Sequence, residues 1–489
     1  MRKTLRKNIN FRMLQRIVGS LLVLEAVFLL VPLATAIIYG ETYDMWVFAA
    51  VAFVTAVAGY AMWRPKPRSS RMGKREGFLL TSLVWVIYSC FGMLPFIFGS
   101  PHVNVSTAFF EAMAGFTTTG ATAMKEFPTS HAVQIWQAMM QWLGGMGIIL
   151  FTVAILPAFN TAGGMHMFNA EATGITHDKV LPRISQTAMA LWGVYLSLTV
   201  ILTGLLWIGP MTLFESVCHA FGTISTGGYS CHSESLWGYG SDYIMIVVCL
   251  FMFLGGMNFT IIFKTVWGRF RQVRHNEVLK VYVLAILVFT LLFVIGHIQR
   301  GNIQSWRDVT IIPLFQVVSI ITSTGYIAPG FSLWEPFILG LTFIMMFCGG
   351  CAGSTSGGAK IDRILYLHRY VSNEVKRSYF SRVVFSVKLN GQVVSNELVT
   401  KVVAFLCLML MLIVGGGLVM SAFGLAPVDS FFSALSCMCN TGFGASLTGY
   451  GQDFATLPDS AKWVLSALML TGRLEIFSIL VLFSPGFWK

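Results

Sequence analysis

Apolar stretches long enough to cross a lipid bilayer recur along the whole 489-residue chain, and they restrict what it can fold into. A hydrocarbon core of ~30 Å is crossed by ~20 apolar residues in a helix. Because hydrophobic residues make up 55% of the chain and charged residues only 11%, a soluble fold is excluded. The sequence therefore predicts an all-α membrane protein with about ten spans. They lie near residues 17–39, 46–63, 77–98, 132–157, 186–209, 242–265, 278–298, 335–371 (interrupted), 399–424 and 461–484.

Lysine and arginine gather in alternate linkers, and this pattern predicts the orientation of the chain. The segments 1–16 and 64–75 carry six such residues each, and the segment from Lys360 to Lys401 carries eight. Basic loops stay in the cytoplasm, so both termini and these linkers are expected there. The opposite face carries mostly acids, which would raise the local concentration of cations.

The net charge of +12 is therefore mainly a sign of topology. A secondary attraction to the anionic head groups of membrane lipids is expected from the basic linkers. Bases are not interleaved with aromatic residues in the way that nucleic-acid binding requires, so no nucleic-acid partner is predicted.

A short motif rich in hydroxyl residues and glycine occurs four times, each time between an apolar segment and the next span. The copies are TTTGA (117–121), ISTGG (224–228), TSTGY (322–326) and NTGF (440–443). Small residues follow each copy at a similar distance, in LGGMGI (143–148), LGGMNF (254–259), CGGCAG (348–353) and LTGRLE (470–475). Two signals in register predict four copies of one unit, which consists of a span, a half-crossing helix, an irregular segment and a second span.

The repeat divides the chain into six parts. Between residues 383 and 397, apolar and polar residues alternate around Asn390 and Gly391, which predicts a β-hairpin. The expected parts are an N-terminal two-span segment (1–70), repeat 1 (71–160), repeat 2 (161–270), repeat 3 (271–378), a cytoplasmic hairpin linker (379–398) and repeat 4 (399–489).

Irregular backbone at membrane depth is the physical clue to what the repeated motif does. Such backbone cannot face lipid, because each unsatisfied N–H or C=O group costs several kcal/mol, so it is buried in protein or lines a wet cavity. Four such segments around one axis would turn carbonyl and hydroxyl oxygens inward, enough to replace the water shell of a monovalent cation. Glycine permits the positive φ that this arrangement needs. For any single motif, a capped turn between helices remains the alternative.

These motifs resemble the Trk/Ktr/HKT superfamily of potassium-translocating subunits. Three further features resemble its TrkH/TrkG branch: the additional N-terminal pair of spans, GGCAGSTSGGAK (349–360) and the ending GRLEIFSILVLFSPGFWK (472–489). The resemblance implies four M1-P-M2 channel-like repeats around a central pore and potassium uptake across a bacterial inner membrane. It also implies that K+ is the only metal bound, that no cofactor is needed and that the chain is not an enzyme.

By this resemblance, a potassium filter is formed by three residues and one glycine from each repeat. Ile224 and Cys439 lack a hydroxyl, so backbone carbonyls would serve at these two positions. The expected filter residues are Thr117, Thr118, Thr119, Gly120, Ile224, Ser225, Thr226, Gly227, Thr322, Ser323, Thr324, Gly325, Cys439, Asn440, Thr441 and Gly442.

Small and polar residues interrupt the eighth span. Each glycine costs ~1 kcal/mol in a helix interior, so the stretch is expected to form a loop, although its composition also fits a close-packed helix crossing. The resemblance implies a gate below the filter, formed by Gly349, Gly350, Cys351, Ala352, Gly353, Ser354, Thr355, Ser356, Gly357 and Gly358.

Arg473 is a lone arginine in the last span, and such a residue must face protein or water. A pair with Glu475 is one interpretation, although side chains two residues apart on a helix point in different directions. The resemblance implies that Arg473 projects into the pore beneath the filter and repels cations while the gate is closed.

The resemblance also implies partners: a homodimer assembled on a cytosolic nucleotide-binding ring of the TrkA type. We expect the hairpin linker to be part of that interface. The chain has no GxGxxG or Walker pattern, so nucleotide control must come from a partner.

Other functions fit the residues less well. A secondary transporter with discontinuous helices, coupling H+ or Na+ to a solute, predicts an inverted repeat and buried acids at mid-membrane. A membrane enzyme requires a constellation of catalytic groups within the spans. The pairs Cys218-His219 and Cys231-His232 could suggest a zinc site, but their spacing matches no compact zinc motif. Cys348 and Cys351 form a C-x-x-C sequence without the context of a metal or redox motif. Packing is the preferred interpretation of these residues.

Overall fold

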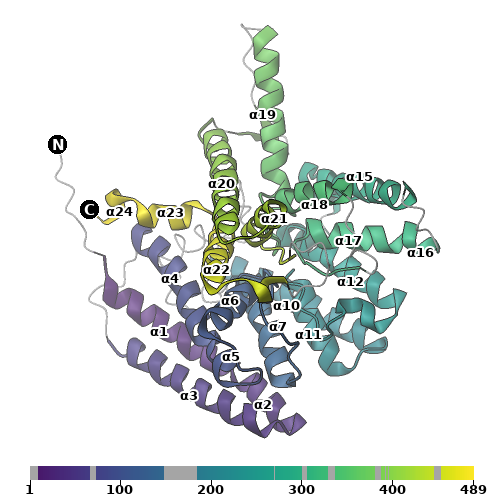
Figure 1. The fold of residues 1–489 in the computed structure, drawn as a ribbon. Helices are drawn as coiled ribbons and strands as arrows, with labels where there is room; N and C mark the ends of the chain where they lie inside the picture. Colours follow the sequence, from purple (N-terminus) through teal and green to yellow (C-terminus); the bar gives the residue numbers. More distant parts are fainter. Residues whose placement is uncertain are drawn as a thin grey trace, which may run out of the picture.

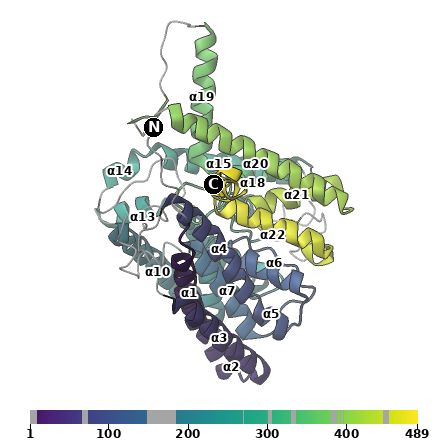
Figure 2. The ribbon, with the colours of Figure 1, turned by 90° about the vertical axis from the view of Figure 1, so that its left-hand side faces the viewer.

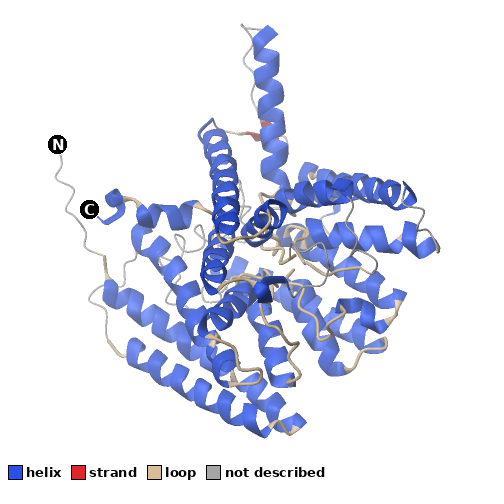
Figure 3. Cartoon of the chain, viewed as in Figure 1, coloured by secondary structure: helices blue, strands red, loops and turns tan. Residues whose placement is uncertain are grey.

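The described part of the protein is mostly helical, and many of its loops gather near the centre of the molecule (Figure 3). The computed structural model describes residues 9–65, 73–147, 184–268, 270–299, 305–328, 336–379, 387–390, 392–394, 396–444 and 453–488.

Six helical segments within these ranges are long and apolar enough to cross a membrane. They are Phe11–Tyr39, Thr42–Trp63, Arg75–Phe98, Gln186–Ile208, Glu277–Gly296 and Glu397–Ala422. All six coincide with predicted spans, and they make the chain an integral membrane protein.

An N-terminal helix pair lies at one side of the bundle (Figure 1). It consists of α1 (Phe11–Phe28), which continues as α2 (Leu30–Tyr39), and α3 (Thr42–Trp63). The pair touches backbone to backbone at two glycines, because a β-carbon on Gly59 would lie 2.8 Å from Val23 N and 2.9 Å from Gly19 O. This close approach is the packing that membrane helices achieve with small residues.

The rest of the chain repeats one three-helix unit four times. The first helices are α4 (Lys74–Gly92), α10 (Ile184–Ile208), α15 (Glu277–Gln299) and α20 (Asn396–Ala422). The short pore helices are α6 (Val105–Phe116), α11 (Leu213–Ile224), α17 (Ile311–Ile321) and α21 (Pro427–Met438). The third helices are α7 (His131–Gly145), α12 (Asp242–Gly255), α18 (Pro336–Cys348) and α22 (Asp459–Arg473).

The four units form a closed ring. The third helix of each unit packs against the pore helix of the next, in the pairs α7 with α11, α12 with α17, α18 with α21 and α22 with α6. The last pair returns to the first unit, so the irregular segments that follow the pore helices surround one axis. The predicted arrangement of four channel-like repeats around a centre is confirmed.

The third helices break below the ring, and here the prediction of continuous spans over 242–265 and 461–484 is wrong. The chain bends by 104° between α12 and α13 (Phe259–Val266) and by 117° between α22 and α23 (Phe477–Phe483). In the third unit the break is a loop that separates α18 from α19 (Ile361–Tyr379). In the first unit α7 ends at Gly145, and residues 148–157 of the predicted span lie outside the described residues.

The helix α19 extends away from the bundle in both views (Figure 1 and Figure 2). Beyond it, β1 (Lys388–Leu389) pairs antiparallel with β2 (Gln392–Val393), which confirms the core of the predicted hairpin. Residues 383–386, 391 and 395 of that prediction lie outside the described residues. The remaining elements are α5 (Leu94–Phe98), η2 (Ser235–Tyr239), α14 (Phe270–Arg274), α16 (Trp306–Val309), η3 (Asp453–Thr456) and α24 (Pro485–Trp488).

The contact between α1 and α3 generates a first prediction. A Gly59→Leu substitution forces these helices apart and lowers the stability of the detergent-solubilised protein by about 1–3 kcal/mol, the usual cost of overpacking. The matched control is Gly204→Leu in α10, because a β-carbon there meets nothing within 4 Å. Thermal unfolding of the two variants measures the difference, and equal unfolding temperatures would contradict the close packing.

Candidate functional site

All four irregular segments share one backbone conformation. The pore helices end at residues Phe116, Ile224, Ile321 and Met438, and the next residue caps each helix. The second residue after each helix has a positive φ: 55° at Thr118, 54° at Thr226, 53° at Ser323 and 52° at Asn440. Two residues later a glycine again has a positive φ: 71° at Gly120, 72° at Gly228, 87° at Gly325 and 79° at Gly442. A non-glycine residue with positive φ is rare, so its presence in all four copies marks a built site.

This geometry corrects the register predicted for the second repeat. The glycine equivalent to Gly120 is Gly228, whereas Gly227 is equivalent to Thr119. Ile224, expected as the first filter residue, is instead the last residue of α11, and Ser225 takes the capping position. The first position after the helix therefore carries a hydroxyl in three repeats, and Cys439 is the one exception. The other expected filter residues all lie in the four segments.

The four glycines close the ring between repeats. A β-carbon at each would lie closer to a carbonyl oxygen of the next repeat than real β-carbons come. These contacts are Gly120 with Gly227 O, Gly228 with Thr324 O, Gly325 with Thr441 O and Gly442 with Thr119 O. Any side chain at these positions would therefore push two repeats apart, and the left-handed φ would strain it as well.

A cavity of about 130 Å³ lies on one side of this ring. All four ring glycines contribute to its wall, together with Glu126, His232 and Phe443. The cavity leads directly onto the irregular segments, so an ion or water molecule in it would meet their backbone.

In the first and third repeats, the threonine hydroxyl groups form hydrogen bonds within the protein itself. Thr117 Oγ1 donates to Met113 O at 2.6 Å and lies 2.8 Å from Thr119 Oγ1. Thr322 Oγ1 makes the same contacts, to Val318 O at 2.7 Å and to Thr324 Oγ1 at 2.7 Å. These side chains therefore brace the strand, and backbone carbonyls are the better candidates to bind an ion.

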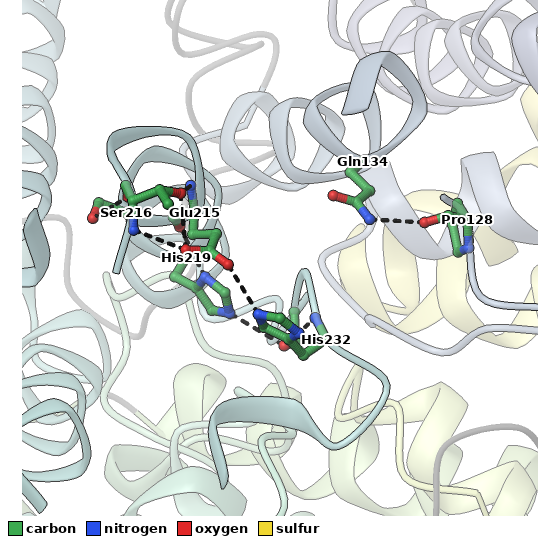
Figure 4. Close-up of polar contacts among 8 residues, drawn as sticks. Pro128, Gln134, Glu215, Ser216, His219 and His232 are labelled. Carbon is green, nitrogen blue, oxygen red and sulfur yellow. Dashed lines mark hydrogen bonds and ion pairs between the residues drawn. The ribbon is translucent and has the colours of Figure 1, made fainter. Parts of the chain in front are cut away.

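In three repeats, a polar side chain in the middle of the pore helix holds the extended backbone that follows the ring glycine, which we call the outgoing strand. It lies nine residues before the ring glycine. Glu111 accepts a hydrogen bond from Ala123 N at 2.6 Å, and Gln316 accepts one from Ala328 N at 2.8 Å. In the second repeat His219 Nε2 lies 3.1 Å from Ser230 Oγ (Figure 4). The outgoing strand is thus fixed to the pore helix that precedes the irregular segment.

The histidines of the two Cys-His pairs are engaged in this network. His219 Nδ1 lies 2.8 Å from Glu215 O, and His232 Nε2 lies 2.9 Å from Glu215 Oε1 (Figure 4). Among the residues that the structure describes, no group of three or more His, Cys, Asp or Glu is placed to hold a metal ion. The packing interpretation of these pairs is the one that the contacts support.

The interrupted eighth span breaks as predicted. Residues 349–360 form a loop between α18 and α19, with positive φ at Gly349, Gly353 and Gly358. The loop lies against the ends of the pore helices, because Thr355 Oγ1 donates to Ile224 O at 3.1 Å and Gly357 N donates to Ser323 Oγ at 2.5 Å. A close-packed helix crossing is therefore excluded.

Two cationic side chains contact this loop. Arg473 donates to Thr355 O at 2.9 Å, and it also donates to Gly144 O at 2.5 Å and Gly145 O at 2.8 Å. It thereby joins the loop, the last span and the first repeat. Lys360, which is buried, donates to Ser356 O within the loop. Glu475 does not pair with Arg473 but accepts from Arg363 at 2.5 Å.

Sequence reasoning missed Gly228 and Lys360. A signal for Gly228 was present, because the capping box of Thr212 and Glu215 marks the start of α11. The first pore helix has its N-cap at Asn104, 16 residues before Gly120, and counting 16 residues from Thr212 reaches Gly228. Lys360 lies at the end of the predicted gate stretch, and its burial, which its neighbour Arg363 shares, is not visible in the sequence.

Known proteins resemble the chain over nearly its full length. The family described as "TrkH: Cation transport protein" matches residues 44–489. The Trk system potassium uptake protein TrkH of Salmonella typhimurium is 35% identical, over 98% of this chain and 100% of the relative. The TrkH of Vibrio parahaemolyticus is 36% identical, over 98% of this chain and 99% of the relative. The crystal structure of the potassium transporter TrkH from Vibrio parahaemolyticus superposes with a TM-score of 0.87 at 33% identity, and it covers 98% of this chain and 100% of that chain.

A glycine-to-alanine substitution, which adds one methyl group, tests the register of the second repeat. Gly228→Ala places a β-carbon against Thr324 O, whereas Gly240→Ala has a comparable φ of 59° but meets nothing within 4 Å. Both variants share the cost of a left-handed alanine, so the collision alone makes Gly228→Ala less stable by about 1–3 kcal/mol. Unfolding of the two purified variants measures this difference, and equal stabilities would argue against the assigned register.

Proposed function

Because the chain belongs to the TrkH family of cation transport proteins, we propose that it takes up potassium ions through the ring of four irregular segments. The observation that carries this proposal is the closed ring itself, in which four strands of one conformation meet at Gly120, Gly228, Gly325 and Gly442. The membrane is proposed to be a bacterial inner membrane, with both termini in the cytoplasm, as the distribution of basic residues favours.

The proposed filter binds K+ mainly with backbone carbonyls. Alternation between left- and right-handed φ lets successive carbonyls of one strand turn to the same side, so that each repeat offers several oxygens to one axis. Each pore helix also ends next to its strand, and the C-terminal end of a helix carries a partial negative charge. A site built from neutral oxygens and helix ends attracts a cation and still releases it.

The loop of residues 349–360 is proposed to be the gate of this pore. It contacts the ends of the second and third pore helices, where an ion would leave the filter. Arg473 tethers the loop through Thr355 O, and its charge opposes the passage of a cation. Movement of the loop would remove the steric barrier and break its hydrogen bond with Arg473.

Partners are proposed from the family. We propose a homodimer on a cytosolic nucleotide-binding ring of the TrkA type, which the extended α19 and the hairpin β1–β2 would meet. Membrane lipid surrounds the spans, and no organic cofactor is proposed. The division into 1–70, 71–160, 161–270, 271–378, 379–398 and 399–489 remains the proposed domain organisation.

Ion uptake tests the main proposal. Liposomes that contain the purified chain are expected to take up 86Rb+, with competition by K+ but little competition by Na+ or choline. A Gly120→Asp variant is expected to lose this uptake, because any side chain there collides with Gly227 O. Gly240→Asp is the control, since that glycine has open space around it. Uptake that depends on Na+ or on a co-transported solute would instead favour a secondary transporter.

The role of Arg473 is tested without the cytosolic partner. Arg473→Ala removes the tether and the charge below the filter, so 86Rb+ uptake should rise, by roughly tenfold if one charged hydrogen bond holds the loop closed. Arg473→Lys keeps the charge but not the geometry of the three hydrogen bonds, and should give an intermediate rate. An Arg473→Ala rate equal to that of the wild type would contradict the proposed gate.

A further inference from the structure

The third position of the irregular segment differs in one repeat only. It carries Thr119, Thr324 and Thr441 in the first, third and fourth repeats, but Gly227 in the second. The backbone of Gly227 does not require glycine, because its φ is not in the left-handed region. Some feature of the surroundings must therefore account for the missing side chain.

The side chain of Gln141 occupies that space. A β-carbon on Gly227 would lie 2.5 Å from Cδ, 2.6 Å from Oε1 and 2.9 Å from Cγ of Gln141, and these are its three nearest neighbours. Gln141 is fully buried in α7, the third helix of the preceding repeat. The side chain of Gln141, from the first repeat, thus fills the space that a side chain at Gly227 would occupy in the second repeat.

Both ends of the Gln141 amide hold the strand of the second repeat. Nε2 donates to Gly227 O at 2.9 Å, and Oε1 accepts from Tyr229 N at 3.2 Å. Gly227 O is also the carbonyl that faces Gly120 of the first repeat. One buried amide therefore fixes the backbone on both sides of the ring glycine, Gly228, at the junction of two repeats.

The position of Gln141 has an identifiable equivalent in two other repeats. Gly144, Gly255 and Gly472 each approach the last carbonyl of their own pore helix, so these glycines are equivalent positions in the third helices. Three residues earlier the first repeat carries Gln141, whereas the second and fourth carry the buried methionines Met252 and Met469. The second and fourth repeats therefore carry methionine at the position where the first repeat carries the glutamine that contacts Gly227.

We propose that Gln141 is a positioning residue that sets the ion selectivity of the second filter strand, in place of the threonine of the other repeats. This inference rests on the proposed potassium filter. A carbonyl held by a fixed donor keeps its place in the ring, so the spacing of the oxygens suits one ion size. Without the amide, Gly227 O and Tyr229 N lose their partners, and the strand can relax around the smaller Na+.

Selectivity is the measurement that separates positioning from a merely structural role. In liposomes, 86Rb+ uptake is competed with K+ and with Na+. The selectivity ratio, which is the inhibitory concentration of Na+ divided by that of K+, is then compared between variants. Gln141→Leu keeps the volume but removes both hydrogen bonds, and should reduce the ratio roughly tenfold. The matched control is Gln134→Leu on the same helix, because that buried glutamine donates to Pro128 O at 2.7 Å outside the ring (Figure 4) and should leave the ratio unchanged.

A double variant distinguishes the proposed role of Gln141 from a simple loss of folding. Gly227→Thr alone collides with Gln141 and should abolish uptake, whereas Gly227→Thr combined with Gln141→Ala removes the collision and should restore uptake, with the reduced selectivity of Gln141→Leu because the amide is absent. An unchanged ratio in Gln141→Leu, or no rescue in the double variant, overturns the inference. A wild-type chain without K+-selective uptake would instead overturn the proposed filter on which the inference depends.

Discussion

The contact between each ring glycine and a carbonyl of the next repeat is the constraint on which the rest of the structure depends. Irregular backbone within a membrane protein must be shielded from lipid, and here four strands shield one another. The contact leaves no room for a β-carbon, so glycine is required at Gly120, Gly228, Gly325 and Gly442. Because the fourth strand meets the first, one covalent chain reproduces the closed symmetry that separate channel subunits achieve by assembly.

Shielding the strands determines the shape of the surrounding helices. Each pore helix must stop where its strand begins, and the third helices must come close enough to cover the helix end. Gly144 and Gly472 make this approach possible, since a side chain at either would meet the last carbonyl of the pore helix. Below this level the third helices bend or break, which leaves space for the loop of residues 349–360 and for Arg473. The breaks are therefore consequences of the filter-like ring.

The four repeats are equivalent in backbone but not in side chains. Within the described residues, the third repeat has the long loop under the ring, and the fourth supplies the arginine that holds it. In the second repeat a glutamine from the first fills the place of a threonine. A single chain can change each repeat separately, which a symmetric assembly of identical subunits cannot do. Different repeats can therefore take different parts in the proposed selection and gating of ions.

The sequence by itself determined the repeat, most of the spans, the break in the eighth span, the hairpin and most residues of the candidate site, because these depend on local composition and spacing. Only the tertiary structure decided the register of the second repeat, the bends after α12 and α22 and the use of the threonine hydroxyls. Two adjacent glycines, Gly227 and Gly228, are indistinguishable by type, and contact with Thr324 O and Gln141 separates them. Such contacts join residues far apart in the chain, and their geometry is not encoded in any local pattern.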